Sequence, residues 1–173
     1  MPTLSLSYVL LPNHRNLWKE PAASILDPRG LHHPFDPVTG EANEESRDQK
    51  IADQAHFWAI SRTLQLTHPR YLAGSGASGL GTMPGISTHT ELELLVRLGL
   101  TPREALAAAT SNYSEQFGWH ELGLVEAGRR ADLLILAGTS SRPDGRHLQY
   151  AQDSLFKLDG AVLDRAALLN AHR

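Results

Sequence analysis

The sequence predicts an α/β fold, and two observations support this. Capping-box residues mark two helix starts in the middle of the chain, at Thr88 and Thr101. Near its end, the two-residue turn Asp159-Gly160 separates two short apolar runs, as in a β-hairpin. With 173 residues, 41% of them hydrophobic and 20% charged, the chain has the length and composition of one globular domain, or of one domain with a small appendage.

The first third of the chain predicts a strand, a long loop and a helix. Residues 4–11 (LSLSYVLL) form an apolar run that indicates a buried strand. Seven prolines and glycines fall within residues 12–43, which we expect to form either an ordered active-site loop or a mobile insertion. Asn43 is suited to cap a helix that extends to about Leu66. The expected apolar face of this helix contains Ile51, Ala55 and Trp58.

The middle of the chain predicts a short strand and two helices. Residues 70–73 form the strand, which leads into a glycine-rich segment. The first helix begins at the capping box 88–91, carries apolar residues on one face, and ends at Gly99. The second begins at the capping box 101–104 and ends before Gly118; its alanines at 105–109 should allow close packing. The apolar face of the first helix consists of Leu92, Leu95 and Val96.

The last third predicts β structure. Gly128 marks a turn, and residues 131–136 form an apolar strand. Residues 155–158 and 161–163 should pair as the hairpin, and residues 165–171 should form a short terminal helix.

Charge and cysteine content restrict the classes of function. The net charge of −3 does not favour binding to nucleic acid or to an anionic membrane. The absence of cysteine excludes disulfides and thiolate ligands, so a metal would need His, Asp or Glu. We see no signal peptide or membrane-spanning segment, and therefore expect a cytoplasmic location.

The segment Gly74–Gly79 has three interpretations. It matches the G-x-G-x-x-G pattern of dinucleotide-binding loops, which requires a helix to open at the third glycine. A flexible turn between a strand and a helix fits the segment better, because Gly81, Met83, Pro84 and Gly85 delay the next helix to about Thr88. The third interpretation, a loop of a metal-dependent hydrolase, depends on the resemblance described below.

Candidate site residues lie in and beside this segment. Ser75 and Ser78 offer hydroxyl groups that could line a substrate pocket, although serines are also common in turns. His89 could lie near a site as a substrate contact, or could simply occupy the helix start. His32, His33 and Asp36 could form a small metal site, with a solvated loop as the alternative.

Four stretches resemble the C-terminal part of the amidohydrolase superfamily, closest to its imidazolonepropionase-like branch. Residues 1–4 resemble the end of the seventh barrel strand and residues 71–76 the eighth strand. Residues 84–106 (PGISTHTELELLVRLGLTPREAL) resemble the eighth helix and its successor, and residues 122–136 the return into a small β-sandwich. The resemblance implies a partial (β/α)8 barrel within residues 1–118, followed by a β-sandwich segment and terminal helix within residues 119–173.

The resemblance also implies chemistry that this chain lacks residues to perform. Complete members use one or two divalent metals, usually zinc, to activate a water that attacks a non-peptide carbon–nitrogen bond. Their eighth strand carries an Asp, but Gly76 stands at that place here, and there is no His-x-His pair. A full barrel also needs about 250 residues. We therefore commit to no catalytic or metal-binding residue and expect no cofactor for this chain alone.

Three functions follow as hypotheses. The first is an incomplete or degenerate amidohydrolase that a complementary chain or a second copy completes, because a piece of barrel has open strand edges. The second is a non-enzymatic interaction module that uses the same fold. The third is a small nucleotide-binding protein that uses the Gly74–Gly79 loop.

Overall fold

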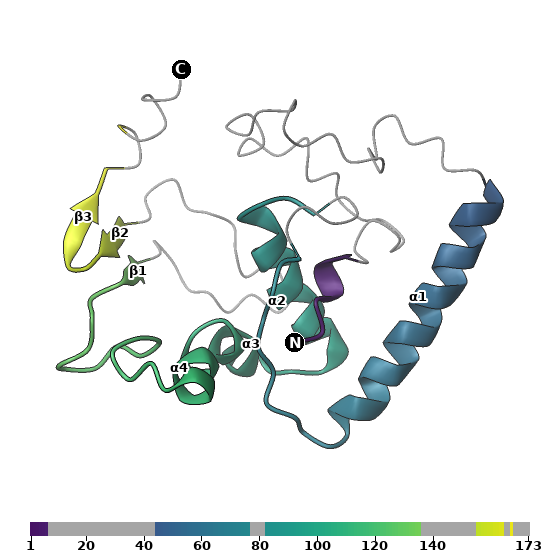
Figure 1. The fold of residues 1–173 in the computed structure, drawn as a ribbon, viewed down its shortest axis with the longest axis horizontal. Coiled ribbons are helices and arrows are strands. Elements are labelled where there is room, and N and C mark those ends of the chain that lie inside the picture. Colours follow the sequence, from purple (N-terminus) through teal and green to yellow (C-terminus); the bar gives the residue numbers. More distant parts are fainter. Residues whose placement is uncertain (7–43, 77–81, 136–154, 165–166, 168–173) are drawn as a thin grey trace.

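A computed structural model describes residues 1–6, 44–76, 82–135, 155–164 and 167. The predictions for residues 12–43, for Ser78 and for the terminal helix therefore lie outside the described residues. The elements are α1 (Glu44–Gln65), α2 (Ile86–Leu98), α3 (Pro102–Ala108), α4 (Ser111–Phe117), β1 (Leu133–Ile135), β2 (Leu155–Leu158) and β3 (Ala161–Leu163). Helix α2 lies at the centre, with α1 on one side and the small sheet on the other (Figure 1). The α/β prediction is confirmed.

The core is built around α2. Its leucines Leu94 and Leu95 are fully buried. Ala105 and Ala108 of α3 are buried as well, because small side chains let the two helices approach closely. Leu4 and Met83 complete the core from outside the helices. Leu4 and Ser5 are thus part of the packed interior.

The two predicted capping boxes have different outcomes. The box at Thr101 is confirmed: its hydroxyl accepts from the Glu104 N–H, and the Glu104 carboxylate accepts from the Thr101 N–H at 2.7 Å. The prediction of a capping box at Thr88 is wrong. Helix α2 already begins at Ile86, and no side chain caps it, because Gly85 occupies the N-cap position. Gly99 ends α2 as predicted, with a φ of 126°.

The long helix predicted after Thr101 is two short helices. Helix α3 ends at Ala108 and α4 begins at Ser111. Thr110 lies between them with a φ of −135°, and its hydroxyl donates to the Leu106 carbonyl at 2.8 Å. The extended φ of Thr110 interrupts the helical backbone at this point. The predicted end at Gly118 is correct, with a φ of 71°.

The β structure of the last third is confirmed. Strands β1, β2 and β3 form one antiparallel sheet in that order. Asp159 and Gly160 both have positive φ angles, 50° and 78°, as a two-residue turn matching the strand twist requires. The Asp159 N–H donates to Asp132 just before β1, at 2.8 Å, and so fastens the hairpin to the first strand.

Two predicted strands are absent from the described residues. Residues 4–6 form one turn of 3₁₀-helix instead of the start of a strand, with Leu6 N–H donating to the Thr3 carbonyl at 3.3 Å. Residues 71–76 have no strand partner among the described residues. A strand needs neighbours for its backbone groups, and here helices supply the partners instead, as described below.

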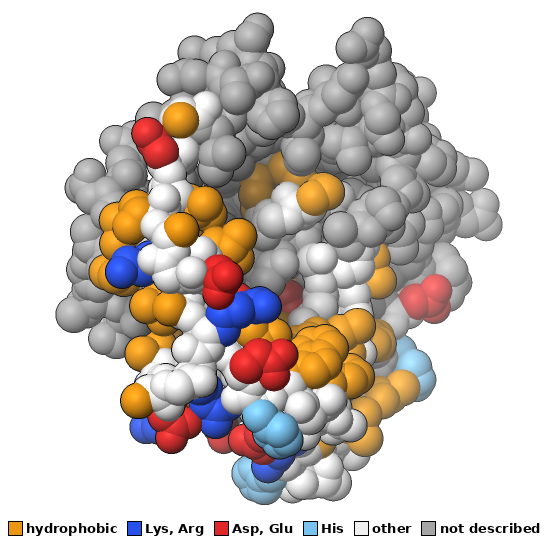
Figure 2. Space-filling view, turned by 60° about the vertical axis from the view of Figure 1, so that its left-hand side comes forward, with side chains coloured by type: hydrophobic (Ala, Val, Ile, Leu, Met, Phe, Trp, Pro, Cys, Tyr) orange, Lys and Arg blue, Asp and Glu red, His pale blue; other side chains and the backbone are white. Residues whose placement is uncertain are grey.

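Helix α1 has the predicted bounds, but its buried face is different. Trp58 is half-buried as expected, whereas Ala55 is exposed and Ser61 is buried. The stripe Phe57, Ile60 and Leu64 is exposed, at 36%, 47% and 56%. On the face that Figure 2 shows, hydrophobic side chains reach the surface at several places beside charged groups. Among the described helices, none is both long and apolar enough to cross a membrane.

Candidate functional site

The glycine-containing segment is held by helices α3 and α4. Ala73 N–H donates to the Ala108 carbonyl at 2.8 Å. The Asn112 amide donates to the Tyr71 carbonyl at 2.8 Å, and the Tyr113 hydroxyl donates to the Ala73 carbonyl. Because these bonds come from two helices, the path of residues 71–73 is fixed, although no strand flanks them in the part of the chain that the structure describes.

Residues 1–6 lie directly on this segment. The Ser5 hydroxyl donates to the Ser75 carbonyl at 2.9 Å. A Cβ atom added at Gly74 would lie 2.5 Å from Met1 Sδ. A Cβ added at Gly76 would lie 2.7 Å from Thr3 Cγ2 and 2.9 Å from Leu6 Cγ. Real Cβ atoms do not approach other atoms so closely, so a side chain at either position would require the side chains of residues 1–6 to shift.

Glu91 of α2 is the charged residue at the centre of this arrangement. Its side chain is fully buried, and its Oε2 accepts from the Ser5 N–H at 2.6 Å. Burial raises the pKa of Glu91 above its ordinary value, and the hydrogen bonds from Ser5 and Leu4 oppose that rise. The local environment therefore penalises the charged form, which the bond from Ser5 stabilises.

The sequence contains a pattern that indicates the burial of Glu91, although the capping-box interpretation placed this residue at the helix start. Ser87, Glu91, Leu94 and Leu98 follow helical spacing, so they share one face of α2, and all four are buried. A carboxylate among such positions must find a hydrogen-bond donor. The Ser87 hydroxyl accepts from the Met83 N–H at 2.7 Å and so helps to start the helix.

The predicted site residues have separate places in the structure. Ser75 is half-buried on the glycine segment and contributes its carbonyl to the bond with Ser5. Ser78 lies outside the described residues, as do His32, His33 and Asp36. His89 is half-buried in the first turn of α2, and burial lowers its pKa, which favours the neutral ring. The roles of Ser75, Ser78 and His89 in a substrate pocket stay predictions.

The residues around Gly76 do not fit a divalent metal. The place of the family carboxylate has no side chain, and its surroundings are the methyl groups of Thr3 and Leu6. Among the described residues, the buried carboxylate near this place is Glu91, and its Oε2 is bonded to the Ser5 N–H. No group of three metal-ligating side chains lies together in the described part of the chain. We therefore derive no chemical step through a metal at this place.

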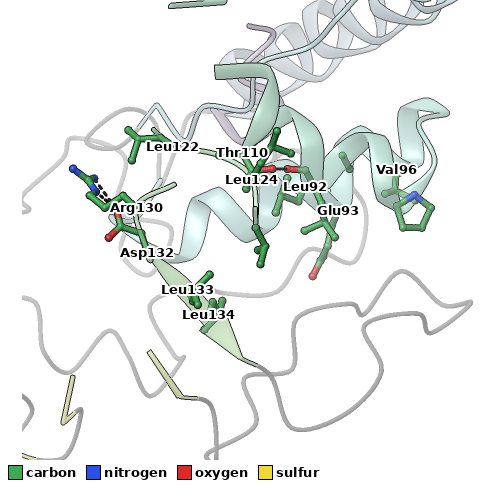
Figure 3. A pocket seen from close by; sticks show the side chains of 15 residues that line it. Leu92, Glu93, Val96, Thr110, Leu122, Leu124, Arg130, Asp132, Leu133 and Leu134 are labelled. Carbon is green, nitrogen blue, oxygen red and sulfur yellow. Dashed lines mark hydrogen bonds and ion pairs between the residues drawn. The ribbon is translucent and has the colours of Figure 1, made fainter. Parts of the chain in front are cut away.

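A second feature is an apolar cavity of about 490 Å³ between helices α2 and α3 and strand β1. Leucines from all sides line it, and the Arg130–Asp132 ion pair, 2.6 Å long, stands at one end (Figure 3). Its volume is in the range of small-molecule sites. The lining leucines are Leu92, Leu106, Leu122, Leu124, Leu133 and Leu134.

Comparison with known proteins places this geometry in a family. A protein-family model described as "Amidohydrolase family" matches residues 71–163, just over half of the chain. The chain belongs to the amidohydrolase family. The matched region contains the glycine segment, helices α2 to α4 and all three described strands.

Its curated relatives carry the names of two enzymes. Imidazolonepropionase of Deinococcus radiodurans is 46% identical over 63 residues, which are 36% of this chain and 16% of that protein. Imidazolonepropionase of Rubrobacter xylanophilus is 41% identical over 73 residues, 39% of this chain and 17% of that protein. Adenine deaminase 2 of Agrobacterium fabrum is 51% identical over 51 residues, 28% of this chain and 8% of that protein.

The chain thus matches less than a fifth of the length of each of these relatives. No solved structure matches the chain significantly. The comparisons bear out the amidohydrolase resemblance and give no support to the nucleotide-binding hypothesis. In the structure, α2 begins at Ile86 and not at Gly79, whereas a dinucleotide loop needs the helix to open at its third glycine.

Proposed function

We propose that this chain is the C-terminal part of an amidohydrolase and that hydrolysis of non-peptide carbon–nitrogen bonds belongs to the completed assembly. The family match over residues 71–163 supports this proposal, as do relatives named imidazolonepropionase and adenine deaminase. In this proposal residues 1–118 correspond to the last units of a (β/α)8 barrel and residues 119–173 to part of the adjoining β-sandwich.

The observation that carries the proposal is the environment of Gly76. The family match includes this position, but the side chain that would handle a metal or a proton is absent from it. Glycine can do neither, and Thr3 and Leu6 fill the adjacent space. We therefore propose that the described chain on its own does not hydrolyse such substrates.

Apolar surfaces support association with further polypeptide. The cavity beside β1 and the stripe Phe57, Ile60 and Leu64 on α1 expose apolar area that a packed partner would bury. The relatives are several times longer than the matched region, and we propose that the partner supplies the earlier barrel units or is a second copy of this chain. If the partner supplies the earlier barrel units, its side chains would bind a zinc or other divalent ion.

Native mass spectrometry of the protein isolated from its source tests this proposal. We expect a complex with a second polypeptide that carries metal, together with turnover of adenine or imidazolonepropionate by the complex. The isolated chain with added zinc is the matched control and should show no turnover. A metal-free single chain without activity would contradict a role in hydrolysis and favour the interaction module. Turnover by the isolated chain would contradict the incomplete-enzyme proposal.

A further inference from the structure

We propose that the place where the family carries its eighth-strand carboxylate is, in this chain, a seat for residues 1–6, with Glu91 as its anchor. The seat consists of Gly74, Ser75 and Gly76 on one side and Glu91 on the other. This proposal goes beyond the proposed function, because it states what this place does in the described chain whether or not a partner completes an enzyme.

The first argument is the fit between the glycines and the residues that cover them. Met1 occupies the space that a side chain at Gly74 would need, and Thr3 with Leu6 occupies the space at Gly76. Gly76 also has a φ of 53°, a backbone conformation that most residues other than glycine seldom adopt. In this arrangement the side-chain atoms of Thr3 and Leu6 occupy the space that an Asp at Gly76 would need, so an Asp would have to displace them.

The second argument is the backbone of Thr3. Its φ of 53° is unfavourable for a β-branched residue. A strained residue of this kind persists when its surroundings determine its conformation. Here the Leu6 N–H donates to the Thr3 carbonyl at 3.3 Å, and the Thr3 methyl group lies against Gly76. The contacts of the seat therefore hold Thr3 in this conformation.

The third argument is the bond to Glu91. Ser5 is itself buried, its N–H donates to Glu91 Oε2 at 2.6 Å, and its hydroxyl donates to Ser75. One residue of segment 1–6 therefore bridges α2 and the glycine segment. A buried carboxylate bonded to a backbone N–H fixes that backbone strongly, because losing the donor would leave the charge unsatisfied in the interior.

Substitution of Gly76 tests the fit directly. Gly85 is the matched control, since it also has a positive φ (80°) but nothing within 4 Å of an added Cβ. We expect Gly76→Ala to lower the folding equilibrium constant at least about tenfold more than Gly85→Ala does. Adding Thr3→Ser and Leu6→Ala, which remove the atoms in contact, should recover most of that difference. Equal losses for the two glycine variants, or no recovery, would overturn the proposal.

Hydrogen exchange tests the anchor in the full chain. We expect the Ser5 amide to be protected in the wild type and to exchange at least about tenfold faster in Glu91→Ala. Glu93→Ala, on the same helix but at the apolar cavity, should leave Ser5 exchange unchanged. An unprotected Ser5 amide in the wild type, or equal exchange in the Glu91 variant, would refute the anchor. If Glu91→Ala does not fold, the glycine substitutions decide the question.

A zinc titration followed by native mass spectrometry tests the consequence for metal binding. Because the seat is filled, we expect Gly76→Asp to bind no more zinc than the wild-type chain under the same conditions. One additional zinc per chain in Gly76→Asp, without loss of stability, would show that the place still has room for the family's ligand and would overturn the proposal.

Discussion

Gly123 offers the sharpest test of how the loop before β1 is held against the helices. This residue has a φ of 82°, and an added Cβ would lie 2.8 Å from the Thr110 carbonyl oxygen. The same Cβ would lie 3.1 Å from Ser111 Cα, so the obstacle is backbone at the junction of α3 and α4. Backbone cannot move aside as a flexible side chain can.

The magnitude follows from two contributions to the free energy of unfolding. The left-handed conformation costs about 1–2 kcal/mol for a residue with a side chain. Displacing packed backbone adds about 1–3 kcal/mol. We therefore expect Gly123→Ala to lower the free energy of unfolding by about 2–5 kcal/mol. Gly128→Ala should lose only the first contribution, because Gly128 has a φ of 87° and nothing within 4 Å.

Urea unfolding of both variants, followed by circular dichroism, measures this difference. The midpoint of Gly123→Ala should fall clearly below that of Gly128→Ala at an unchanged denaturant slope. Equal midpoints would refute the inference that the loop packs directly on Thr110. The comparison is sharp because the two glycines share their backbone conformation and differ in their surroundings.

Four further predictions follow from features described above. Burial raises the pKa of Glu91 in the folded protein above its ordinary value of 4.5, so the folded protein keeps this proton to a higher pH than the unfolded chain does. The resulting stabilisation is complete below pH 4.5 and is lost as the pH rises through the folded pKa. In urea unfolding at a series of pH values, Glu91→Gln should make the free energy of unfolding depend less steeply on pH. Thr101→Ala should cost about 1 kcal/mol in the same assay, whereas Thr101→Ser should keep most of the cap. Leu95→Ala, which empties the centre of the core, should cost about 2–5 kcal/mol, and a loss below 1 kcal/mol would contradict the described packing. Ile60→Lys should change the free energy of unfolding by less than about 0.5 kcal/mol but should weaken self-association measured by sedimentation. An unchanged sedimentation profile would mean that two copies of the chain do not associate through this face of α1.

Local signals predicted the elements that depend on neighbouring residues. The hairpin at Asp159-Gly160, the capping box at Thr101 and the helix ends at Gly99 and Gly118 all follow from backbone chemistry within a few positions. The partners of these backbone groups lie within a few positions, so the sequence pattern was sufficient to predict these four elements, although the same kind of signal at Thr88 failed.

Predictions that needed distant partners were less successful. Residues 71–76 have the pattern of a strand, yet among the described residues their partners are helices α3 and α4. Residues 4–6 likewise form a turn, because they pack on the glycine segment. The helical spacing of α2 indicates that Glu91 is buried, but its hydrogen-bond donor Ser5 lies 86 positions away in the sequence. No local pattern contains that contact.

The bonds to residues 71–76 also determine how a barrel could be completed. Along an extended segment, the backbone groups of alternate residues point to the same side, so Tyr71 and Ala73 share one edge. That edge already donates to Ala108 and accepts from Asn112 and Tyr113. A strand arriving on this side would have to displace those groups before it could pair. Assembly would then be an exchange reaction whose rate is set by opening of the helices, and raising the partner concentration would increase that rate only up to a plateau.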